Sequence, residues 1–290
     1  MDLFGEKKKW SIIQIINFAK NNFVFIESNK NPQTDIEIFL CFILKCNRAD
    51  LYLKNKNILN NAQLDILRSY IDRRNKNEPI QYIIKNSNFY GRDFFVNSDV
   101  LIPRPETERL IDIALEKAKK IEFPKIFDVG TGSGCISITL ALEIPDSQVY
   151  GSDISKKAIK IAQKNKDNLF VENLQLINED IFLKISHNSL DILISNPPYV
   201  KPDEYLVLMP DVLNFEPKIG LTDDLDGLSF YKRLAELGMS HLNKGGWIIV
   251  EVGKGKHPQE AKEIFKKYDY KNIKLFKDYN QDQRVLVAQN

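Results

Sequence analysis

The chain has 290 residues, enough for one large α/β domain with a full hydrophobic core and a smaller companion domain. Its 41 basic and 39 acidic side chains nearly cancel, which argues against a dedicated nucleic-acid binder but leaves a nucleic-acid substrate open. Three cysteines without a CxxC pair, and no apolar run near the ~20 residues that cross a bilayer, predict a cytoplasmic protein without a disulfide framework or a membrane span.

The first 77 residues are predicted to form a small helical domain. Apolar side chains recur near the helical period in three stretches, residues 10–18, 36–44 and 64–71. Asn31-Pro32 marks the start of the second stretch, with Thr34 or Asp35 as the expected helix cap. Such stripes are more typical of a packed bundle than of a cofactor site. The polar run at residues 73–77 is predicted to be a solvated boundary between domains.

The next segment, residues 78–102, is predicted to be a β-hairpin linker between two domains. Residues 81–84 and 89–96 have the composition of short strands around a glycine-containing turn. A helix is expected to follow at residues 109–120, because Pro105 suits a first helical turn and acidic residues stand just inside it.

From residue 103 to the end, the sequence predicts one α/β domain in which strands and helices alternate. The expected strands are residues 126–129, 148–152, 174–177, 191–195 and 247–252, and the clearest helices are residues 156–166, 229–241 and 258–268. This alternation implies a parallel sheet with helices on both faces. Two late strands, near residues 273–276 and 284–288, are expected to pair as a hairpin at one edge of the sheet.

A glycine-rich loop follows the first of these strands. Gly130-Thr131-Gly132-Ser133-Gly134 lies between the strand at residues 126–129 and a helical run that begins at Cys135. Alternate glycines let the backbone turn tightly and approach a ligand, at the carboxyl ends of strands where open α/β sheets bind ligands. The spacing is GxGxG rather than the GxGxxG that binds a pyrophosphate, which favours S-adenosylmethionine over NAD.

Two acids at the ends of the second and third strands are candidate cofactor ligands. Asp153 could accept hydrogen bonds from both hydroxyls of a ribose, or it could cap the helix that begins near Ser155. Asp180 could accept from the exocyclic amine of an adenine with Ile181 packed on the ring, or it could be a solvated loop acid. The order of strand, glycine loop, helix and carboxylate favours the cofactor-binding alternative.

The fourth strand ends in the tetrapeptide Asn196-Pro197-Pro198-Tyr199. The two prolines carry no N–H and lock φ, so their carbonyl oxygens stay free to accept hydrogen bonds. The Asn196 side chain adds another acceptor, and Tyr199 offers a flat aromatic face. If this strand lies beside the glycine-loop strand, the tetrapeptide can hold a planar –CO–NH₂ or aromatic amine next to a cofactor. The alternative is a strand-terminating turn in which Asn196 caps its own backbone.

Over most of its length the chain resembles the peptide chain release factor glutamine methyltransferases, the PrmC/HemK family. Besides the glycine loop and the tetrapeptide, the resemblance runs through Glu78-Pro79-Ile80-Gln81-Tyr82-Ile83, Phe94 to Val96, Leu101-Ile102-Pro103-Arg104-Pro105-Glu106-Thr107-Glu108, Glu216-Pro217, Asp226-Gly227-Leu228 and Gly245-Gly246. The motif at residues 103–108 discriminates best. Related ribosomal-protein glutamine methylases carry a Pro-Arg-Ser type sequence there, and DNA adenine methylases lack it. Family members often have an aromatic residue in place of Ile181, and a Gly-Arg pair in the segment at residues 280–284, a departure expected to bear little on catalysis.

The resemblance implies a class I S-adenosylmethionine-dependent methyltransferase domain with a Rossmann-like fold, preceded by the helical domain and the hairpin linker. It implies methyl transfer from S-adenosyl-L-methionine to the side-chain amide nitrogen of the glutamine in the Gly-Gly-Gln motif of class-I translation release factors. The implied cofactor contacts are Gly130, Thr131, Gly132, Ser133, Gly134, Asp153, Asp180, Ile181 and Asn196. The implied catalytic and substrate-binding residues are Asn196, Pro197, Pro198 and Tyr199, with Arg104 as a further substrate contact.

Several alternatives stay open at this point. The tetrapeptide could serve an adenine exocyclic-amine methyltransferase acting on DNA or RNA, or a ribosomal-protein glutamine methyltransferase. An NAD-dependent oxidoreductase and a catalytically silent binding module fit the motifs less well. The three histidines, His187, His241 and His257, show no ligand spacing, so no metal site is expected. We expect a monomer whose helical domain docks the release factor, without a stable nucleic-acid partner.

Overall fold

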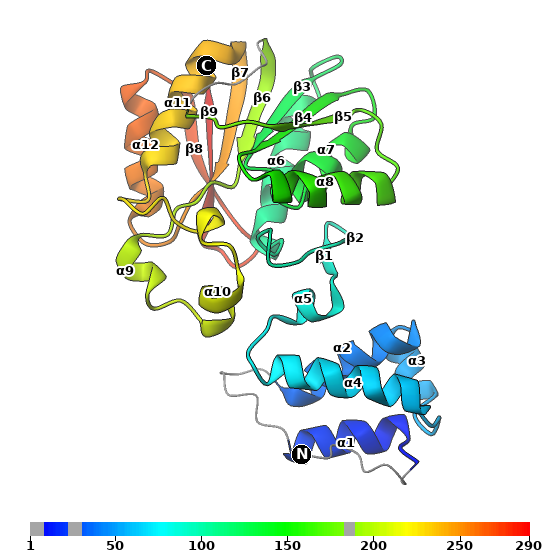
Figure 1. Cartoon of the computed structure of the whole chain (residues 1–290). Helices are drawn as coiled ribbons and strands as arrows, with labels where there is room; N and C mark the ends of the chain where they lie inside the picture. The colour runs from blue at the N-terminus through cyan, green and yellow to red at the C-terminus, as the bar shows by residue number, and fades with distance from the viewer. Residues whose placement is uncertain (1–8, 23–30, 183–188) are drawn as a thin grey trace. The chain divides into compact units, whose positions relative to one another are not determined.

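The computed structural model describes residues 9–22, 31–182 and 189–290, and the chain divides into two compact units (Figure 1). The first unit comprises Met1–Lys85 together with Pro210–Phe215, and the second comprises Asn86–Met209 and Glu216–Asn290. Within the described ranges, no helix combines the length and the apolar character needed to cross a membrane.

The first unit contains a bundle of short helices around its own core. In chain order these are α1 (Ile12–Asn22), α2 (Pro32–Leu44), α3 (Arg48–Leu53), α4 (Asn61–Arg74) and α5 (Ile80–Ile84). The helices α1, α2 and α4 coincide with the three predicted stretches, and Ile15, Phe39 and Leu67 from them are fully buried in one cluster. Helix α3 is too short for its periodicity to be seen in the sequence.

Helix α2 begins differently from the prediction. Its N-cap is Asn31, whose side chain accepts a hydrogen bond at 3.1 Å from the backbone N–H two residues on. The predicted caps, Thr34 and Asp35, are wrong, because Pro32 occupies the first helical position and the cap must precede it. Asp35 instead accepts from Arg74 Nε at 2.9 Å. Arg74 is 3% exposed, so this part of the predicted solvated boundary is buried.

Residues 80–84 form helix α5 and not the predicted strand. The carbonyl oxygen of Pro79, the N-cap residue, accepts from the Ile83 N–H at 3.1 Å. Arg73 donates to the carbonyl oxygens of Tyr82 and Ile83, at 3.1 Å in each case. A short apolar run cannot be assigned to helix or strand from its periodicity, and here these contacts at the two ends of the segment stabilise the helix.

The second unit begins with the predicted β-hairpin. Its strands are β1 (Ser87–Phe89) and β2 (Arg92–Phe94), which pair antiparallel. Tyr90 and Gly91 connect them with φ angles of 51° and 73°, as a two-residue hairpin turn requires. Phe89 and Phe94 are fully buried in a core cluster of this unit, so the hairpin is packed against the α/β domain.

Seven further strands form one sheet in the order β5-β4-β3-β6-β7-β9-β8. Their bounds are β3 (Lys125–Val129), β4 (Gln148–Asp153), β5 (Leu174–Asn178), β6 (Leu190–Ser195), β7 (Leu242–Glu251), β8 (Lys271–Lys277) and β9 (Gln283–Gln289). Neighbours from β5 to β7 are parallel, whereas β9 is antiparallel to both β7 and β8. The predicted parallel sheet with an antiparallel hairpin at one edge is confirmed, although β7 begins at Leu242 rather than Trp247.

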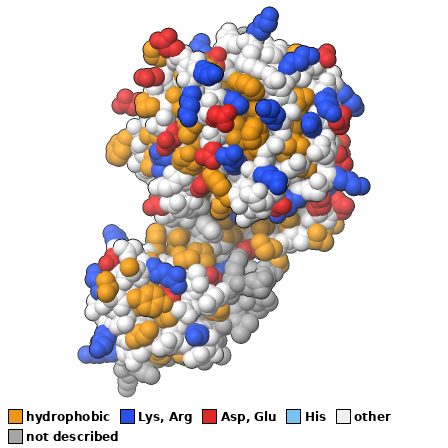
Figure 2. Space-filling model, turned by 180° about the vertical axis from the view of Figure 1, so that it is seen from behind, with side chains coloured by type: hydrophobic (Ala, Val, Ile, Leu, Met, Phe, Trp, Pro, Cys, Tyr) orange, Lys and Arg blue, Asp and Glu red, His pale blue; other side chains and the backbone are white. Residues whose placement is uncertain are grey.

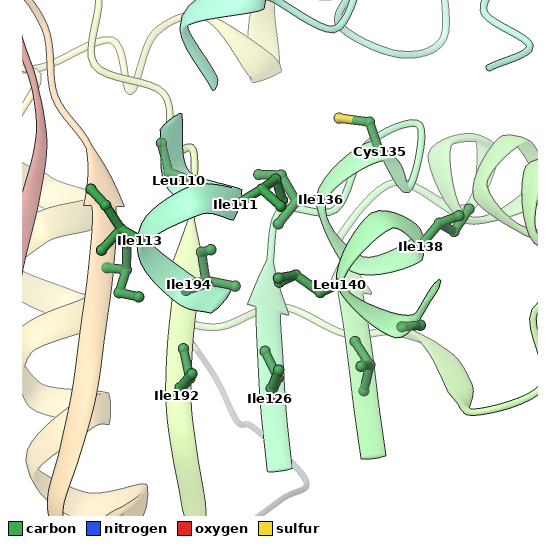
Figure 3. Close-up of a cluster of buried hydrophobic side chains, with 14 of the residues drawn as sticks. Leu110, Ile111, Ile113, Ile126, Cys135, Ile136, Ile138, Leu140, Ile192 and Ile194 are labelled. Carbon is green, nitrogen blue, oxygen red and sulfur yellow. The ribbon is translucent and has the colours of Figure 1, made fainter. Parts of the chain in front are cut away.

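Helices cover both faces of this sheet (Figure 1). On one face lie α6 (Glu108–Ala118), α7 (Cys135–Glu143) and α8 (Lys156–Asn168), and on the other lie α11 (Ser229–His241) and α12 (His257–Lys267). Because side chains alternate along a strand, Ile126 joins the cluster under α6 and α7, and Phe127 joins the cluster under α11 and α12. Figure 3 shows side chains of α6 and α7 packed over Ile126, Ile192 and Ile194.

Short helices interrupt two connections of the chain. The segment at residues 103–108 forms a 3₁₀ turn, η1 (Pro105–Thr107), that leads directly into α6. Between β6 and α11 the chain forms α9 (Pro202–Tyr205), α10 (Pro210–Phe215) and η2 (Lys218–Gly220). Elements of three to six residues leave no periodic signal, so the sequence does not predict α9, α10 or η2.

Candidate functional site

The carboxyl ends of β3 and β6 lie side by side in the centre of the sheet. The strands β4 and β5 extend the sheet on one side of β3, and β6 and β7 extend it on the other. Val129 pairs with Ser195, so the glycine loop and Asn196 leave the sheet at adjacent positions. Open α/β sheets bind ligands at such a switch point. The predicted adjacency of the two motifs is therefore confirmed.

A cavity of about 210 Å³ lies at this switch point, lined entirely by residues of the second unit. The predicted site residues that line it are Gly130, Gly132, Asp153, Asp180, Ile181, Asn196, Pro197 and Pro198. Among the described residues of its lining, Asp99, Asp153, Glu179 and Asp180 are acidic and none is basic. The cavity therefore suits a ligand with hydroxyl or amine donors, or a positive charge, better than one with phosphates.

Positive φ angles shape the glycine loop. Gly130, Gly132 and Gly134 have φ of 72°, 55° and 82°, a region that glycine adopts without strain. A Cβ on Gly134 would lie 2.8 Å from Ile138 Cδ1 and 3.2 Å from Ala162 Cβ. Gly134 therefore allows close packing of α7 on α8, and it does not line the cavity.

Thr131 and Ser133, the two other residues of the loop, do not line the main cavity. Both are buried, and they border a second, smaller cavity of about 40 Å³ together with Arg104 and Asn196. Thr131 is held in place because its backbone N–H donates to the Ser152 carbonyl oxygen at 2.8 Å. Their predicted contacts with a cofactor stay predictions.

Asp153 connects the end of β4 to the glycine loop. Its Oδ2 accepts from the Gly132 N–H at 2.9 Å, and its Oδ1 accepts from the Ser155 N–H at 2.8 Å. The N-cap of α8 is Ser155, whose hydroxyl accepts from the Ala158 N–H at 3.2 Å, so Asp153 is not the helix cap. Burial raises the pKa of Asp153, and the two backbone hydrogen bonds oppose that rise. Each carboxylate oxygen still has a lone pair for a ligand.

Asp180 and Ile181 border the cavity beyond the end of β5. Asp180 Oδ1 accepts from the Phe182 N–H at 2.9 Å, and the buried Ile181 accepts at its carbonyl oxygen from Arg233 Nε at 2.6 Å. The rings of Phe182 and Phe230 meet edge to face with centroids 5.0 Å apart, and both residues line the cavity. These two residues, which the sequence motifs do not identify, supply the aromatic surface that Ile181 lacks.

The tetrapeptide divides between two environments. Asn196, Pro197 and Pro198 line the cavity, and neither proline carbonyl oxygen accepts a hydrogen bond from a described residue. Tyr199 is absent from the described lining, and its hydroxyl donates to Glu251 Oε1 at 3.2 Å. Burial raises the pKa of Tyr199, so the phenol stays protonated near neutral pH. Its predicted contact with the substrate stays a prediction.

Asn196 is held by a chain of hydrogen bonds. Its Nδ2 donates to Thr107 Oγ1 at 3.2 Å, and the Thr107 hydroxyl donates to Glu251 Oε2 at 2.6 Å. Thr107 and Glu251 are 2% and 1% exposed. Asn196 Oδ1 has no hydrogen-bond partner within the part of the chain that the structure describes. The alternative in which Asn196 caps its own backbone is therefore wrong.

Arg104 lies at the smaller cavity and not at the main one. Its guanidinium forms an ion pair with Glu216, whose other carboxylate oxygen accepts from the Ile102 N–H at 3.2 Å. These contacts fix the segment that leads into η1. The predicted contact of Arg104 with the substrate stays a prediction.

The histidines take part in other contacts. His257 Nδ1 accepts from the Gly253 N–H at 3.0 Å and Nε2 faces the Gly227 carbonyl oxygen at 3.0 Å, so Nε2 carries the proton. Burial lowers the pKa of His257. His187 lies outside the described residues. In the ranges that the structure describes, no three His, Cys, Asp or Glu side chains are grouped so that they could hold a metal ion.

Comparisons with known proteins decide the family. A family model described as a methyltransferase domain matches residues 124–266, and one described as the PrmC N-terminal domain matches residues 23–84. The chain is 36% identical, over 99% of its length, to a release factor glutamine methyltransferase of Fusobacterium nucleatum, of which it covers 82%. A protein of the same name from Flavobacterium psychrophilum is 36% identical over 94% of this chain and is 99% covered. The chain belongs to the release factor glutamine methyltransferase family.

A solved structure supports the fold. The 16S rRNA N2 G1207 methyltransferase of T. thermophilus, in complex with AdoMet and guanosine, matches with a TM-score of 0.51 and 14% identity, over 71% of this chain and 49% of that chain. At this identity the likeness concerns the fold alone. The predicted class I methyltransferase fold and the predicted family are both confirmed.

In this member of the release factor glutamine methyltransferase family, two residues that contact or support the tetrapeptide, Glu251 and Arg284, are not identified by the sequence motifs. Glu251 ends the apolar strand β7 and accepts from Tyr199 and Thr107. Arg284 donates from Nη2 to the Tyr199 hydroxyl at 3.4 Å and from Nη1 to the Val252 carbonyl oxygen at 3.0 Å. The segment at residues 280–284 thus contacts the tetrapeptide, although it was expected to bear little on catalysis. A lone acid at the end of an apolar strand is the signal that could have identified Glu251.

A third missed residue, Asp128, lies in β3 beneath the glycine loop of this family member. It is fully buried. Burial raises the pKa of its carboxyl to about 7, while the neighbouring hydroxyls of Thr131 and Ser137 oppose the rise. An acid within an otherwise apolar central strand is again the available signal.

Proposed function

We propose that this protein transfers a methyl group from S-adenosyl-L-methionine to the side-chain amide nitrogen of the glutamine in the Gly-Gly-Gln motif of class-I translation release factors. One observation carries the proposal. Asn196 and Pro197, after β6, line the same cavity as Gly130 and Asp153, at the ends of β3 and β4. Acceptors for a planar amide therefore lie beside a site suited to a nucleoside, and membership of the family supports both assignments.

The residues of the cavity fit this cofactor. Asp153 would accept from the ribose hydroxyls, since each oxygen keeps a lone pair after accepting one backbone N–H. Asp180 would accept from the adenine amine, with Ile181 and Phe182 against the base. The absence of basic side chains from the described lining suits a cationic cofactor without phosphates. When bound, the cofactor supplies an electrophilic methyl group on a sulfonium.

The tetrapeptide would position the glutamine amide. An amide nitrogen is a poor nucleophile because its lone pair is delocalised into the carbonyl group. Asn196 Oδ1 and the Pro197 carbonyl oxygen would accept its two N–H groups and hold the nitrogen toward the methyl group. The new N–C bond forms as the C–S bond breaks, and the nitrogen releases one proton to solvent. Positioning and exclusion of water can lower such a barrier by ~7–11 kcal/mol at best.

The variant Asn196→Ala tests the proposal most directly. We expect methyl transfer to fall by about 100-fold or more, as when one preorganised hydrogen-bonding group is removed from an active site. The affinity for S-adenosyl-L-methionine should be nearly unchanged, because the loop and Asp153 remain intact. Asn168→Ala, an exposed change at the end of α8, is the matched control. Near-normal turnover by Asn196→Ala would contradict the proposal.

The same assay identifies the substrate. The protein is incubated with S-adenosyl-L-methionine labelled in its methyl group and with a release factor, a release factor whose Gly-Gly-Gln glutamine is replaced, a ribosomal protein fraction, DNA or RNA. Label on the intact release factor alone supports the proposal, and label on nucleic acid or a ribosomal protein overturns the proposed substrate.

In Figure 2, basic and acidic side chains are interspersed over the visible face without forming a basic stripe.

Residues 1–77 would dock the release factor away from the reacting glutamine, residues 78–102 would connect them to the catalytic domain at residues 103–290, and the protein would act as a cytoplasmic monomer. Leu53, 83% exposed on the first unit, is one apolar side chain available for docking. Unchanged affinity for the release factor after removal of residues 1–77 would contradict the docking role.

A further inference from the structure

One buried carboxylate is linked to both ends of the tetrapeptide, directly to Tyr199 and through Thr107 to Asn196. Glu251 Oε1 accepts from the Tyr199 hydroxyl at 3.2 Å, and Glu251 Oε2 accepts from the Thr107 hydroxyl at 2.6 Å. Thr107 in turn accepts from Asn196 Nδ2 at 3.2 Å. Glu251 and Thr107 do not line the main cavity, so they act on a bound substrate through Asn196 and Tyr199.

The direction of this hydrogen-bond chain is fixed by its buried end. An ionised carboxylate only accepts, so the single hydroxyl proton of Thr107 points to Glu251. Thr107 Oγ1 can then only accept a hydrogen bond from Asn196, so Asn196 must present its amide N–H group to it. Asn196 therefore turns Nδ2 to Thr107, and Oδ1 is left as the acceptor without a partner among the described residues.

The surroundings of Glu251 match an ionised acceptor. Two hydroxyl donors face its two oxygens, and Arg284 Nη2 lies 3.8 Å from Oε1. Arg284 is fixed independently by its hydrogen bond to the Val252 carbonyl oxygen. Burial raises the pKa of Glu251, and these contacts with Thr107, Arg284 and Tyr199 oppose that rise.

We infer that Glu251 is a positioning residue that, through Thr107, sets the orientation of the Asn196 amide so that its oxygen, and not its nitrogen, meets the substrate –NH₂ group. This inference rests on the proposed function. With the opposite orientation, Asn196 would present N–H groups to the N–H groups of the substrate and could not hold it. The same carboxylate braces Tyr199, so one side chain fixes two of the four residues of the tetrapeptide.

Three single variants separate the relay from the bracing contact. Glu251→Gln lets the new amide donate to Thr107, which reverses the chain and turns Asn196 Nδ2 toward the substrate, so kcat should fall by about 100-fold, as when reacting groups are misplaced. Thr107→Val keeps the shape of the side chain but removes the relay, and kcat should fall by about 10-fold. Thr107→Ser retains the hydroxyl and should restore most of the rate. All rates are measured with saturating S-adenosyl-L-methionine and release factor.

The double variant Glu251→Gln with Thr107→Val distinguishes positioning from general structural support. If Glu251 acts on Asn196 through Thr107, the double variant should be about as slow as Thr107→Val alone. Without the Thr107 hydroxyl, the residue at position 251 can no longer influence the orientation of Asn196. Independent structural roles would instead multiply the two losses. Multiplied losses, or a wild-type kcat in Thr107→Val, would overturn the inference.

A second readout does not depend on activity. In protein labelled with ¹⁵N-asparagine, the side-chain N–H₂ resonances of Asn196 are assigned by their loss in Asn196→Ala. They should shift in Glu251→Gln and in Thr107→Val, and stay in place in Thr107→Ser. If these shifts occur but the wild type does not methylate a release factor, the proposed function fails and the positioning of Asn196 stands. If the wild type is active and the resonances do not move, the inference is wrong.

Discussion

The two halves of the cavity are built by different means. On the side of β3 and β4, the backbone forms the site: Gly132 and Ser155 offer N–H groups to Asp153, and the partners are 21 and 2 residues apart in the chain. On the side of β6 and β7, side-chain contacts support the site: Asn196, which lines the cavity, is held through Thr107 by Glu251, and these contacts join positions 89 and 144 residues apart. Under the proposed function, the side that would hold the cofactor depends on nearby sequence, and the side that would hold the substrate depends on the completed tertiary fold.

This difference has a kinetic consequence under the proposed function. Substitutions on the β3–β4 side should weaken the binding of S-adenosyl-L-methionine, and a high cofactor concentration should compensate for the weaker binding. Damage on the β6–β7 side should lower kcat, because it misplaces groups that act on the reacting amide. A substitution on the β3–β4 side that lowered kcat at saturating cofactor, or one on the β6–β7 side that weakened cofactor binding, would show that the two halves are coupled.

Asp153→Ala should have the largest effect on the cofactor side. We expect the Kd for S-adenosyl-L-methionine to rise by roughly 10- to 150-fold, since hydrogen bonds to a charged group contribute about 1.5–3 kcal/mol. Titration calorimetry measures this directly. With saturating cofactor, kcat should stay close to that of the wild type, because Asn196 and its partners are untouched.

Asp153→Asn is the control for this change. It keeps an acceptor for one of the two backbone N–H groups and should lose less affinity than Asp153→Ala. A large fall in kcat at saturating cofactor in Asp153→Ala would contradict the division of the cavity into two independent halves.

The same division explains what the sequence can and cannot predict. Asp153 and Glu251 each end a parallel strand, at β4 and β7. Asp153 is predictable because its partners follow from the glycine loop and the next helix. A lone acid at the end of an apolar strand points to Glu251 as a candidate, but no local pattern indicates that its carboxylate faces Thr107 in a different part of the chain. The strands, the main helices and the adjacency of the two motifs depend on periodicity and strand order, and these are the features predicted correctly.

Helix α5 illustrates a further limit. Its five residues carry an apolar pattern common to strands and helices, and its state depends on Arg73, which donates to the carbonyl oxygens of Tyr82 and Ile83. The aromatic lining is a similar case. Phe182 and Phe230 come from segments far apart in the chain, so only the fold shows that they meet at the cavity.

Gly227→Ala should have the next largest effect, and it acts on the substrate side. A Cβ at Gly227 would lie 2.5 Å from the backbone oxygen of Tyr199, so the tetrapeptide must shift. The φ of 73° adds ~1–2 kcal/mol of strain, and the contact adds ~1–3 kcal/mol. We expect kcat to fall while the affinity for S-adenosyl-L-methionine holds.

Gly91→Ala is the matched control for this clash. Gly91 has the same φ of 73°, but a Cβ there would meet nothing within 4 Å. Urea unfolding should therefore show a lower free energy of unfolding in both variants because of backbone strain. A further decrease from the contact with Tyr199 should appear only in Gly227→Ala. Equal losses of stability and equal kcat values in the two variants would show that the contact with the Tyr199 backbone does not cause the effect of Gly227→Ala.

Asp128→Asn tests the β3 side of the site through the pH dependence of stability. The folded protein holds a proton on Asp128 up to a pKa of about 7, whereas the ordinary value is 3.8. Between these two values the folded state binds more protons than the unfolded state, so rising pH removes stability by at most ~1.4 kcal/mol per pH unit. Above pH 7 both states are ionised and the loss stops.

Asparagine does not titrate, so Asp128→Asn lacks this contribution. Relative to the wild type, its free energy of unfolding should rise from pH 5 to about pH 7 and then level off. Urea unfolding of both proteins at each pH gives this difference and cancels the titration of all other groups. Asp146→Asn, at an exposed turn, controls for the loss of one carboxylate. A difference between Asp128→Asn and the wild type that stays constant over this range would mean that Asp128 is ionised beneath the glycine loop, and the cofactor side would then carry a fixed negative charge under its backbone.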